Sequence, residues 1–326
     1  MMTRDTTPGR TSSGTREQTR PRRRRIWPYL LALGPGLLAA SAGNDAGGIA
    51  TYASAGASYG YGMLWAMVIV TLFVGVVQEM SARLGAVTGK GFSDLVRENF
   101  SLRVTALILL TLFIANFGII VSEFVGIAAA AELFGVSRYI AVPVAAALVW
   151  LLITRGSYDR VEKIFLALTL GFFAYIGAAV LARPDWGDVF WQTVRPTPKL
   201  EVGYLQLLIA LIGTTISPYM QLYVQSSVVE KGVTPEEYRY TRVDVLAGTA
   251  FAGIVASFII IATAATLFPR GITIGTASDA AVALEPVAGP YARVLFGLGL
   301  LGASLLAAGV LPLATTYVMS EALGFE

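Results

Sequence analysis

The sequence predicts an all-α membrane protein, a helical bundle of eight spans of which the first and the sixth are broken. Hydrophobic residues make up 55% of the 326 positions and charged residues 14%, whereas soluble domains carry about 25% charged residues. Several apolar stretches reach the roughly 20 residues that cross the hydrocarbon layer of a bilayer. Two of these stretches contain glycine and polar residues near their centres.

The sequence contains neither cysteine nor histidine. The missing cysteines exclude a disulfide framework and thiolate metal ligands. The missing histidines remove the usual general base, the usual proton relay near neutral pH and the commonest transition-metal ligand. We therefore expect that the protein is not an enzyme and binds no cofactor, because the sequence offers no nucleophile and base that could be paired around a recognisable motif.

Residues 1–26 differ from the rest of the chain in their charge. They hold eight arginines, including the run Arg22 to Arg25, against only Asp5 and Glu17. This composition is typical of a disordered, solvated tail. Nucleic acid is not the expected partner, since the tail lacks interleaved aromatic residues and leads directly into the membrane. We expect residues 27–326 to form a single transmembrane domain.

Hydropathy and the positions of glycine and proline predict the spans in order. The spans are 27–56, 61–84, 102–134, 139–154, 162–182, 203–229, 244–268 and 290–323. If the N-terminus is cytoplasmic, the inner segments hold 18 of the 24 lysines and arginines, and the short loops alone favour the same side by ten to six. The positive-inside rule then predicts a multi-pass protein of the plasma membrane with both ends in the cytoplasm.

The first and sixth spans look like broken helices. The first holds Asn44 and Asp45 among glycines and alanines, and the sixth holds Thr214, Ser217 and Pro218 at the corresponding depth. Proline removes a backbone donor, so carbonyl groups near it become free to face a cavity or an ion. A second break five spans after the first is typical of an inverted repeat with a substrate site at the midplane. The first repeat would cover about 27–182 and a partial second repeat about 203–323.

Asp45 is the strongest candidate for a functional residue. A carboxylate near the bilayer centre costs roughly 2.5 to 3.5 kcal/mol on insertion scales, so it must face water, an ion or a partner. We expect Asp45 to bind a transported cation, and it could also cap the helix that begins at Ala46. Glu123 in the third span lines an aqueous path or makes a structural hydrogen bond, whereas Glu79 is placed to pair with Arg83 one turn later.

Three segments together resemble the Nramp family of divalent metal transporters. They are "GPGLLAASAGNDAGGIATYASAGASYGYGMLW", "VQEMSARLGAVTGKGFSDLVRENF" and "LIGTTISPYMQLYVQSSVVEKG", and the most specific part is "ARLGAVTGKG". The resemblance covers the chain from about residue 27 to its end, in collinear order. It implies a LeuT-like fold, transport by alternating access and a metal site where spans one and six unwind.

The sequence departs from the family's motifs at several positions. The family's Asp-Pro-Gly-Asn reads Asp45, Ala46, Gly47, Gly48, and its Met-Pro-His reads Ser217, Pro218, Tyr219. The third-span Asp of the family's proton route falls on Ile120, while Glu123 is kept. The resemblance therefore implies that the metal ligands are Asp45, the carbonyls of Ala42 and Thr214, and Ser217. The residues expected along the pathway or around these ligands are Asn44, Gly48, Glu123, Tyr219 and Gln221.

Two of these departures replace the family's soft Met and basic His side chains with the hydroxyl groups of Ser217 and Tyr219. Mg²⁺ prefers oxygen ligands and keeps several waters, so the pattern is similar to the Nramp-related magnesium transporter branch. We expect Mg²⁺ transport without proton coupling. A proton-coupled Mn²⁺ or Fe²⁺ importer, or a non-transporting metal-binding receptor or subunit, are the alternatives. The expected partners are the metal ion and the lipid bilayer, with the protein monomeric. A ten-span fold also implies that the sequence, which ends after the eighth span, is C-terminally incomplete.

Overall fold

The computed structural model describes residues 34–156, 158–275, 279–281 and 290–323. The predicted tail 1–26, the first residues of the first span and the last three residues lie outside this part. All assigned elements within it are helical. In chain order they are α2 (Pro35–Ala42), α3 (Ala46–Tyr59), η1 (Gly60–Met63), α4 (Leu64–Thr88), α5 (Phe92–Asn99), α6 (Leu102–Leu133), α7 (Arg138–Arg155), α8 (Tyr158–Thr169), η2 (Leu170–Phe172), α9 (Phe173–Leu181), α10 (Trp186–Val194), α11 (Val202–Thr215), α12 (Pro218–Glu230), α13 (Tyr238–Thr266), η3 (Phe268–Arg270) and α15 (Pro290–Leu323).

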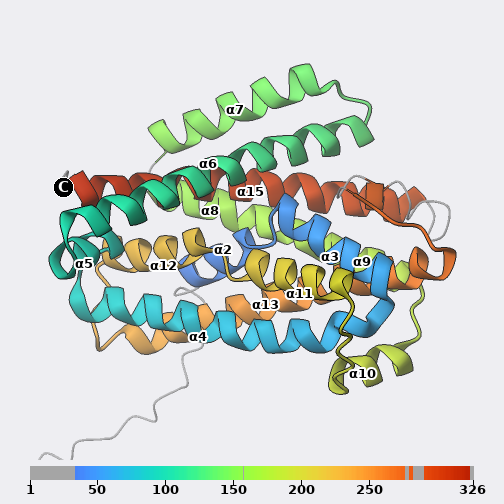
Figure 1. Ribbon diagram of the computed structural model, residues 1–326. Coiled ribbons are helices and arrows are strands. Elements are labelled where there is room, and N and C mark those ends of the chain that lie inside the picture. Colours follow the sequence, from blue (N-terminus) through green and yellow to red (C-terminus); the bar gives the residue numbers. More distant parts are fainter. Residues whose placement is uncertain (1–33, 157, 276–278, 282–289, 324–326) are drawn as a thin grey trace, which may run out of the picture.

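Seven helical stretches of the described residues are long and apolar enough to cross a membrane. The first of them, Ala46–Thr88, contains α3, η1 and α4, and Figure 1 shows that the chain reverses its direction between α3 and α4. Helices α2 and α3 therefore form the first predicted span and α4 the second. Each of the eight predicted spans coincides with helix in the described part of the chain.

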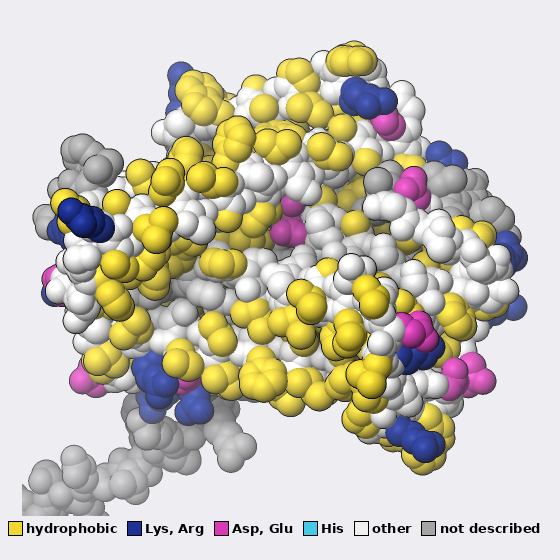
Figure 2. Space-filling view, in the orientation of Figure 1, with side chains coloured by type: hydrophobic (Ala, Val, Ile, Leu, Met, Phe, Trp, Pro, Cys, Tyr) yellow, Lys and Arg dark blue, Asp and Glu magenta, His cyan; other side chains and the backbone are white. Residues whose placement is uncertain are grey.

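Helices α2, α3 and α12 lie inside the bundle, whereas α11 exposes much of its surface and buries Tyr204 and Leu211 (Figure 1). Helix α13 packs against α2, α3 and α4, while α15 packs along α6, and α7 lies on the outer side of α6. The turns predicted to share one side of the membrane lie at one end of the molecule, near α5. On the face in Figure 2, Lys and Arg side chains gather toward the ends, and hydrophobic side chains cover much of the surface between them. This distribution suits a protein that spans a bilayer.

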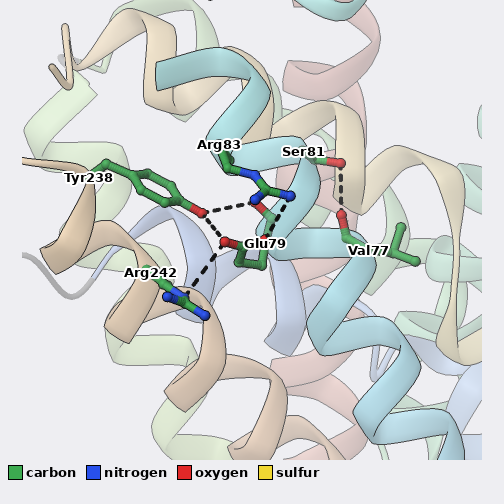
Figure 3. Close-up of polar contacts among 6 residues, drawn as sticks. All are labelled: Val77, Glu79, Ser81, Arg83, Tyr238 and Arg242. Carbon is green, nitrogen blue, oxygen red and sulfur yellow. Dashed lines mark hydrogen bonds and ion pairs between the residues drawn. The ribbon is translucent and has the colours of Figure 1, made fainter. Parts of the chain in front are cut away.

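An ionic cluster joins α4 to α13 near one end of both helices (Figure 3). The Glu79 carboxylate lies 3.6 Å from Arg83, which confirms the predicted pair, and 3.7 Å from Arg242 of α13. The Tyr238 hydroxyl also donates to Glu79 Oε1 at 2.7 Å. The Glu79 side chain is only 14% exposed, so these partners compensate for the water that it has lost.

Two glycines allow the backbones of α2 and α13 to touch where the helices cross. A Cβ at Gly36 would lie 2.6 Å from Val245 Cα, and a Cβ at Gly248 would lie 2.6 Å from Leu37 Cα. Real Cβ atoms essentially never approach other atoms this closely. The crossing therefore requires glycine on both helices.

Asp244 of α13 provides the N-terminal cap that α2 lacks within its own sequence. Residue Gly34 at the N-cap position makes no side-chain hydrogen bond, and the first turn holds no acid. The buried Asp244 carboxylate instead accepts hydrogen bonds from the amides of Gly34, Gly36 and Leu37 at 3.0, 2.7 and 3.2 Å. A negative charge at this end of a helix is also favoured by the helix dipole. A side chain more than 200 positions away thus fixes where the first pass begins.

We expect Asp244→Ala to destabilise the protein strongly. Each buried donor left without a partner costs about 1–3 kcal/mol, and Asp244→Asn should lose less because it keeps one acceptor oxygen. In detergent, we expect Asp244→Ala to lower the apparent melting temperature by about 5–10 °C. The exposed Asp188 offers a matched control, since Asp188→Ala should change the melting temperature little. Equal melting temperatures for Asp244→Ala and wild type would contradict the role of this cap.

Candidate functional site

The first break covers Gly43, Asn44 and Asp45, between α2 and α3. Helix α2 ends with the Gly43 amide donating to the Ala39 carbonyl. Asp45 is extended, with φ −70° and ψ 177°, and its carboxylate accepts a 2.6 Å hydrogen bond from the Gly48 amide. Asp45 is therefore the N-cap of α3, a position that favours a short side chain with an acceptor oxygen. The capping role considered from the sequence is confirmed.

The second break lies at Ile216 and Ser217, between α11 and α12. Ile216 leaves the helical region with φ −108° and ψ 62°, and Ser217 is extended. Pro218 then opens α12, where its missing N–H costs nothing because first-turn donors have no partner within the helix. The Ser217 hydroxyl donates to the Thr214 carbonyl at 2.9 Å. The break that the sequence predicts in the sixth span is confirmed, and Pro218 is the first residue of its second helix.

The two breaks lie against each other in the middle of the bundle. The buried Tyr219 hydroxyl of α12 donates to the Ala42 carbonyl, the last residue of α2, at 2.7 Å. The Tyr52 hydroxyl of α3 lies 3.0 Å from Thr215 Oγ1. A Cβ at Gly48 would lie 3.4 Å from Thr214 Oγ1. Tyr219 of the second interrupted pass therefore completes the backbone of the first, and Tyr52 of the first pass contacts a threonine side chain of the second.

A second carboxylate reaches the same place from α6. Glu123 is completely buried, and its Oε2 accepts a 3.2 Å hydrogen bond from the Ala46 amide, the first residue of α3. Its Oε1 has no hydrogen-bond partner among the residues that the structure describes. Asp45 is 4% exposed, so two acids flank one helix N-terminus away from bulk water. The helix dipole stabilises negative charge at this position.

The remaining predicted residues occupy varied positions around the breaks. Asn44 donates from its side chain to the Ala252 carbonyl of α13 at 3.1 Å. Both polar atoms of the Gln221 side chain are buried, with no partner in the described part of the chain. The carbonyls of Ala42 and Thr214, predicted as ligands, both accept hydrogen bonds from hydroxyl groups in this conformation.

The acids near the break do not form a larger metal-binding cluster. Within the described ranges no group of three or more His, Cys, Asp or Glu side chains could hold a metal ion together. A divalent ion at this place would therefore depend on one or two carboxylates, with the remaining ligands coming from carbonyls, hydroxyls or water. On the face in Figure 2, an acidic side chain is visible midway along the molecule, at the level of the interrupted passes.

A small cavity of about 10 Å³ lies beside both breaks, which is about the space that one water molecule needs. Its walls include Asn44, Gln78, Thr215 and Met220. A Cβ at Gly43 would overlap the Met220 sulfur, and Gln78 Nε2 lies 4.0 Å from that sulfur. The position of Met220 against the first break could not be predicted, because nothing in the sequence relates these two segments in register.

Comparisons with known proteins agree with this architecture. The model of the family described as "Natural resistance-associated macrophage protein-like" matches residues 36–326. The chain is 32% identical to the divalent metal cation transporter MntH of Deinococcus radiodurans over 320 residues, covering 93% of this chain and 71% of that protein. It is also 32% identical to MntH of Klebsiella pneumoniae over 308 residues, covering 91% and 73%.

The fold is similar to that of a solved manganese transporter from Eremococcus coleocola. The TM-score is 0.74 at 23% identity, and the match covers 94% of this chain and 68% of the other. This similarity concerns the fold, and it confirms the LeuT-like helical bundle expected from the sequence.

Two neighbouring glycines allow a test of how tightly the Asp45 carboxylate is held. A Cβ at Gly48 would lie 3.1 Å from the Gly43 carbonyl oxygen and 3.2 Å from Asp45 Oδ1, whereas a Cβ at Gly47 would make only ordinary contacts. We expect Gly48→Ala to destabilise by about 1–3 kcal/mol through overpacking. Gly47→Ala, the matched control, should be neutral or stabilise by up to about 1 kcal/mol. Thermal unfolding in detergent measures both, and equal effects would contradict the tight packing around Gly48.

Proposed function

The chain belongs to the Nramp family, and from this premise we propose that it moves a divalent metal ion through the crossing of its two helix breaks, with Mn²⁺ as the leading substrate. Members of the family are transporters of divalent metal ions and not enzymes. The observation that carries the proposal is the placement of Asp45, a nearly fully buried acid at the N-cap of α3, directly beside the break between α11 and α12. A buried carboxylate at such depth needs a positive partner.

The proposed ligands are Asp45, the carbonyls of Ala42 and Thr214, and Ser217. In the conformation described here, the Tyr219 and Ser217 hydroxyls donate to the two carbonyls. An ion that reached Asp45 would take the place of these hydroxyl donors. We assign Asn44, Gly48, Glu123, Tyr219 and Gln221 to the surroundings of the ion or to its pathway.

We favour Mn²⁺ as the substrate for two reasons, the similarity to known manganese transporters and the position of Met220. Solved structures with a similar fold include the manganese transporter of Eremococcus coleocola, and the expectation of a magnesium branch gains no support from the comparisons. Replacement of the family's Met by Ser217 suggested a site without sulfur. The Met220 thioether, however, lies against Gly43 in the first break, and a soft donor favours Mn²⁺ over Mg²⁺.

Mg²⁺ is a second candidate substrate, because the polar atoms around Asp45 are oxygens. The polar groups gathered around Asp45 are carboxylate, carbonyl and hydroxyl oxygens, from Asp45, Glu123 and Thr214 among others. Hard oxygen ligands with room for retained water suit Mg²⁺. The two ions differ in whether sulfur enters their coordination, so selectivity measurements distinguish them.

Proton coupling depends on Glu123 in this proposal. The sequence predicts uncoupled transport, since Ile120 replaces the third-span Asp of the family. Glu123 nevertheless accepts a hydrogen bond from the amide of Ala46, the residue next to Asp45, and its other oxygen has no described partner. A proton on one acid would relieve repulsion while the other is ionised. A proton-coupled Mn²⁺ importer is therefore the version that we favour.

We further propose that the protein resides in the plasma membrane as a monomer, with its N-terminus in the cytoplasm. The excess of basic residues in the predicted inner loops supports this orientation. The ends of α4, α7 and α12, which precede these loops, lie at the same end of the molecule (Figure 1).

Tyr219→Phe should increase the affinity for the ion. The variant removes the hydroxyl that engages the Ala42 carbonyl, and a hydrogen bond contributes about 1 kcal/mol, so we expect the Kd for Mn²⁺ to fall about fivefold. Tyr52→Phe is the matched control, because its hydroxyl contacts a threonine hydroxyl and no proposed ligand carbonyl. Calorimetric titration of the purified full chain measures both. A weaker affinity for Tyr219→Phe would show that the phenol supports the ion instead of competing with it.

Transport by proteoliposomes tests the function itself. With an internal pH dye, we expect Mn²⁺ uptake to exceed Mg²⁺ uptake at equal concentrations and to acidify the lumen. Asp45→Ala should abolish uptake of both ions while it still inserts and runs as a single species in size-exclusion chromatography. Wild-type uptake by Asp45→Ala would refute the site. Preferred Mg²⁺ uptake without acidification would instead select the magnesium candidate.

A further inference from the structure

A groove on the outside of the bundle combines an apolar wall with two positive charges at one end. It has a volume of about 470 Å³, and it lies between the second half of α7, the first half of α8 and the middle of α15. Its lining includes Leu148, Leu151, Leu152, Arg155, Arg160 and Ile164. It is separate from the helix breaks.

The apolar part of the groove has a rigid floor and exposed walls. Phe165 is 1% exposed, and its ring occupies the space where a side chain at Gly309 of α15 would stand. The groove walls include Leu148, Leu151 and Ile164, which are all exposed. All of these residues belong to helices that are apolar enough to cross the membrane, so their natural neighbour is hydrocarbon.

The two arginines of the groove have no described ionic partner. Arg155 lies in the last turn of α7, Arg160 lies near the start of α8, and both are exposed. No acidic side chain in the described part of the structure forms an ion pair with either of them. The side chains of Asp159 and Glu162 lie outside that part. Two guanidinium groups at one end of an apolar groove therefore suit an amphipathic ligand that has an anionic group and an apolar chain.

The groove residues lie at two depths in the membrane. The arginines lie at the level of the lipid headgroups, and the apolar walls lie at the level of the acyl chains. Helix α7 has 18 residues and is just long enough to cross the hydrocarbon layer, so Arg155 at its end reaches the level of the lipid headgroups. The apolar walls precede Arg155 on α7 and follow Arg160 on α8, within the hydrocarbon. Guanidinium groups bind phosphate oxygens in a fork geometry, and basic pockets between helices suit anionic headgroups.

We propose that this groove binds one anionic phospholipid, with its phosphate at Arg155 and Arg160 and an acyl chain along Leu151, Leu152 and Ile164. Arginines at helix ends often reach toward the membrane surface without a specific partner. Here an apolar groove leads away from both arginines, and this continuity distinguishes a lipid site from a surface charge. The lipid would join α7, which otherwise packs mainly on α6, to α8.

The test measures retained lipid on the purified full chain. The protein is reconstituted with equal amounts of phosphatidylglycerol and phosphatidylcholine, washed in mild detergent and analysed by native mass spectrometry. We expect one retained phosphatidylglycerol in the wild type, with binding about fivefold weaker for each arginine lost in Arg155→Gln and Arg160→Gln. Lys163→Gln is the matched control, since it removes a positive charge from α8 outside the groove. Ile164→Trp should fill the groove and reduce retention although both arginines remain.

The outcomes separate the lipid from its alternatives. Equal losses in Lys163→Gln and in the arginine variants would show general surface attraction and overturn the proposal. Equal retention of phosphatidylcholine and phosphatidylglycerol would overturn it as well, as would displacement of the lipid by millimolar inorganic phosphate, which would indicate a site for a free anion. Size-exclusion chromatography identifies any variant that fails to fold, and the two single arginine variants and Ile164→Trp each test the site independently.

Discussion

Every backbone polar group that leaves a helix inside the hydrocarbon layer needs another partner, and this requirement organises the centre of the protein. Both interrupted passes expose such groups. Asp45 and Glu123 accept from the first amides of α3, and Tyr219 and Ser217 donate to carbonyls at the ends of α2 and α11. The cost of an unpaired group in hydrocarbon is several kcal/mol. The breaks therefore persist because each is completed by side chains around it.

The same pairing gives the site two alternative arrangements. The hydroxyls of Tyr219 and Ser217 engage the carbonyls of Ala42 and Thr214, and these are the oxygens that the proposed ion requires. A cation and the hydroxyl protons thus compete for the same acceptors. Exchange between them would keep these two carbonyl oxygens paired in either arrangement, so binding and release need not leave them without a partner.

The sequence was sufficient to predict the bundle, its spans and both breaks, because these depend on local features: apolar length, Pro218, and polar residues flanked by glycine. It also predicted the helix cap at Asp45 and the pair of Glu79 with Arg83, since the members of each interaction lie within one turn of each other. It missed contacts between distant segments, such as Asp244 with α2 and Met220 with Gly43. Asp244 could have been noticed as an acid at the edge of an apolar span, but its partner could not. The preference for Mg²⁺ followed from aligning Ser217 with the family's Met. That comparison took no account of the Met220 sulfur, which lies one helical turn after Ser217 and packs against Gly43.

The glycine crossing of α2 and α13 has a mechanical consequence. With Gly36 and Gly248 in backbone contact and the Asp244 carboxylate holding the start of α2, neither helix can slide past the other without a collision or the loss of three hydrogen bonds. Helices α2 and α13 are therefore expected to move together as one rigid unit. Any tilt of α13 is then transmitted along α2 to its far end at Ala42, and the hydrogen bond of Asn44 to the Ala252 carbonyl carries the same movement directly to the break.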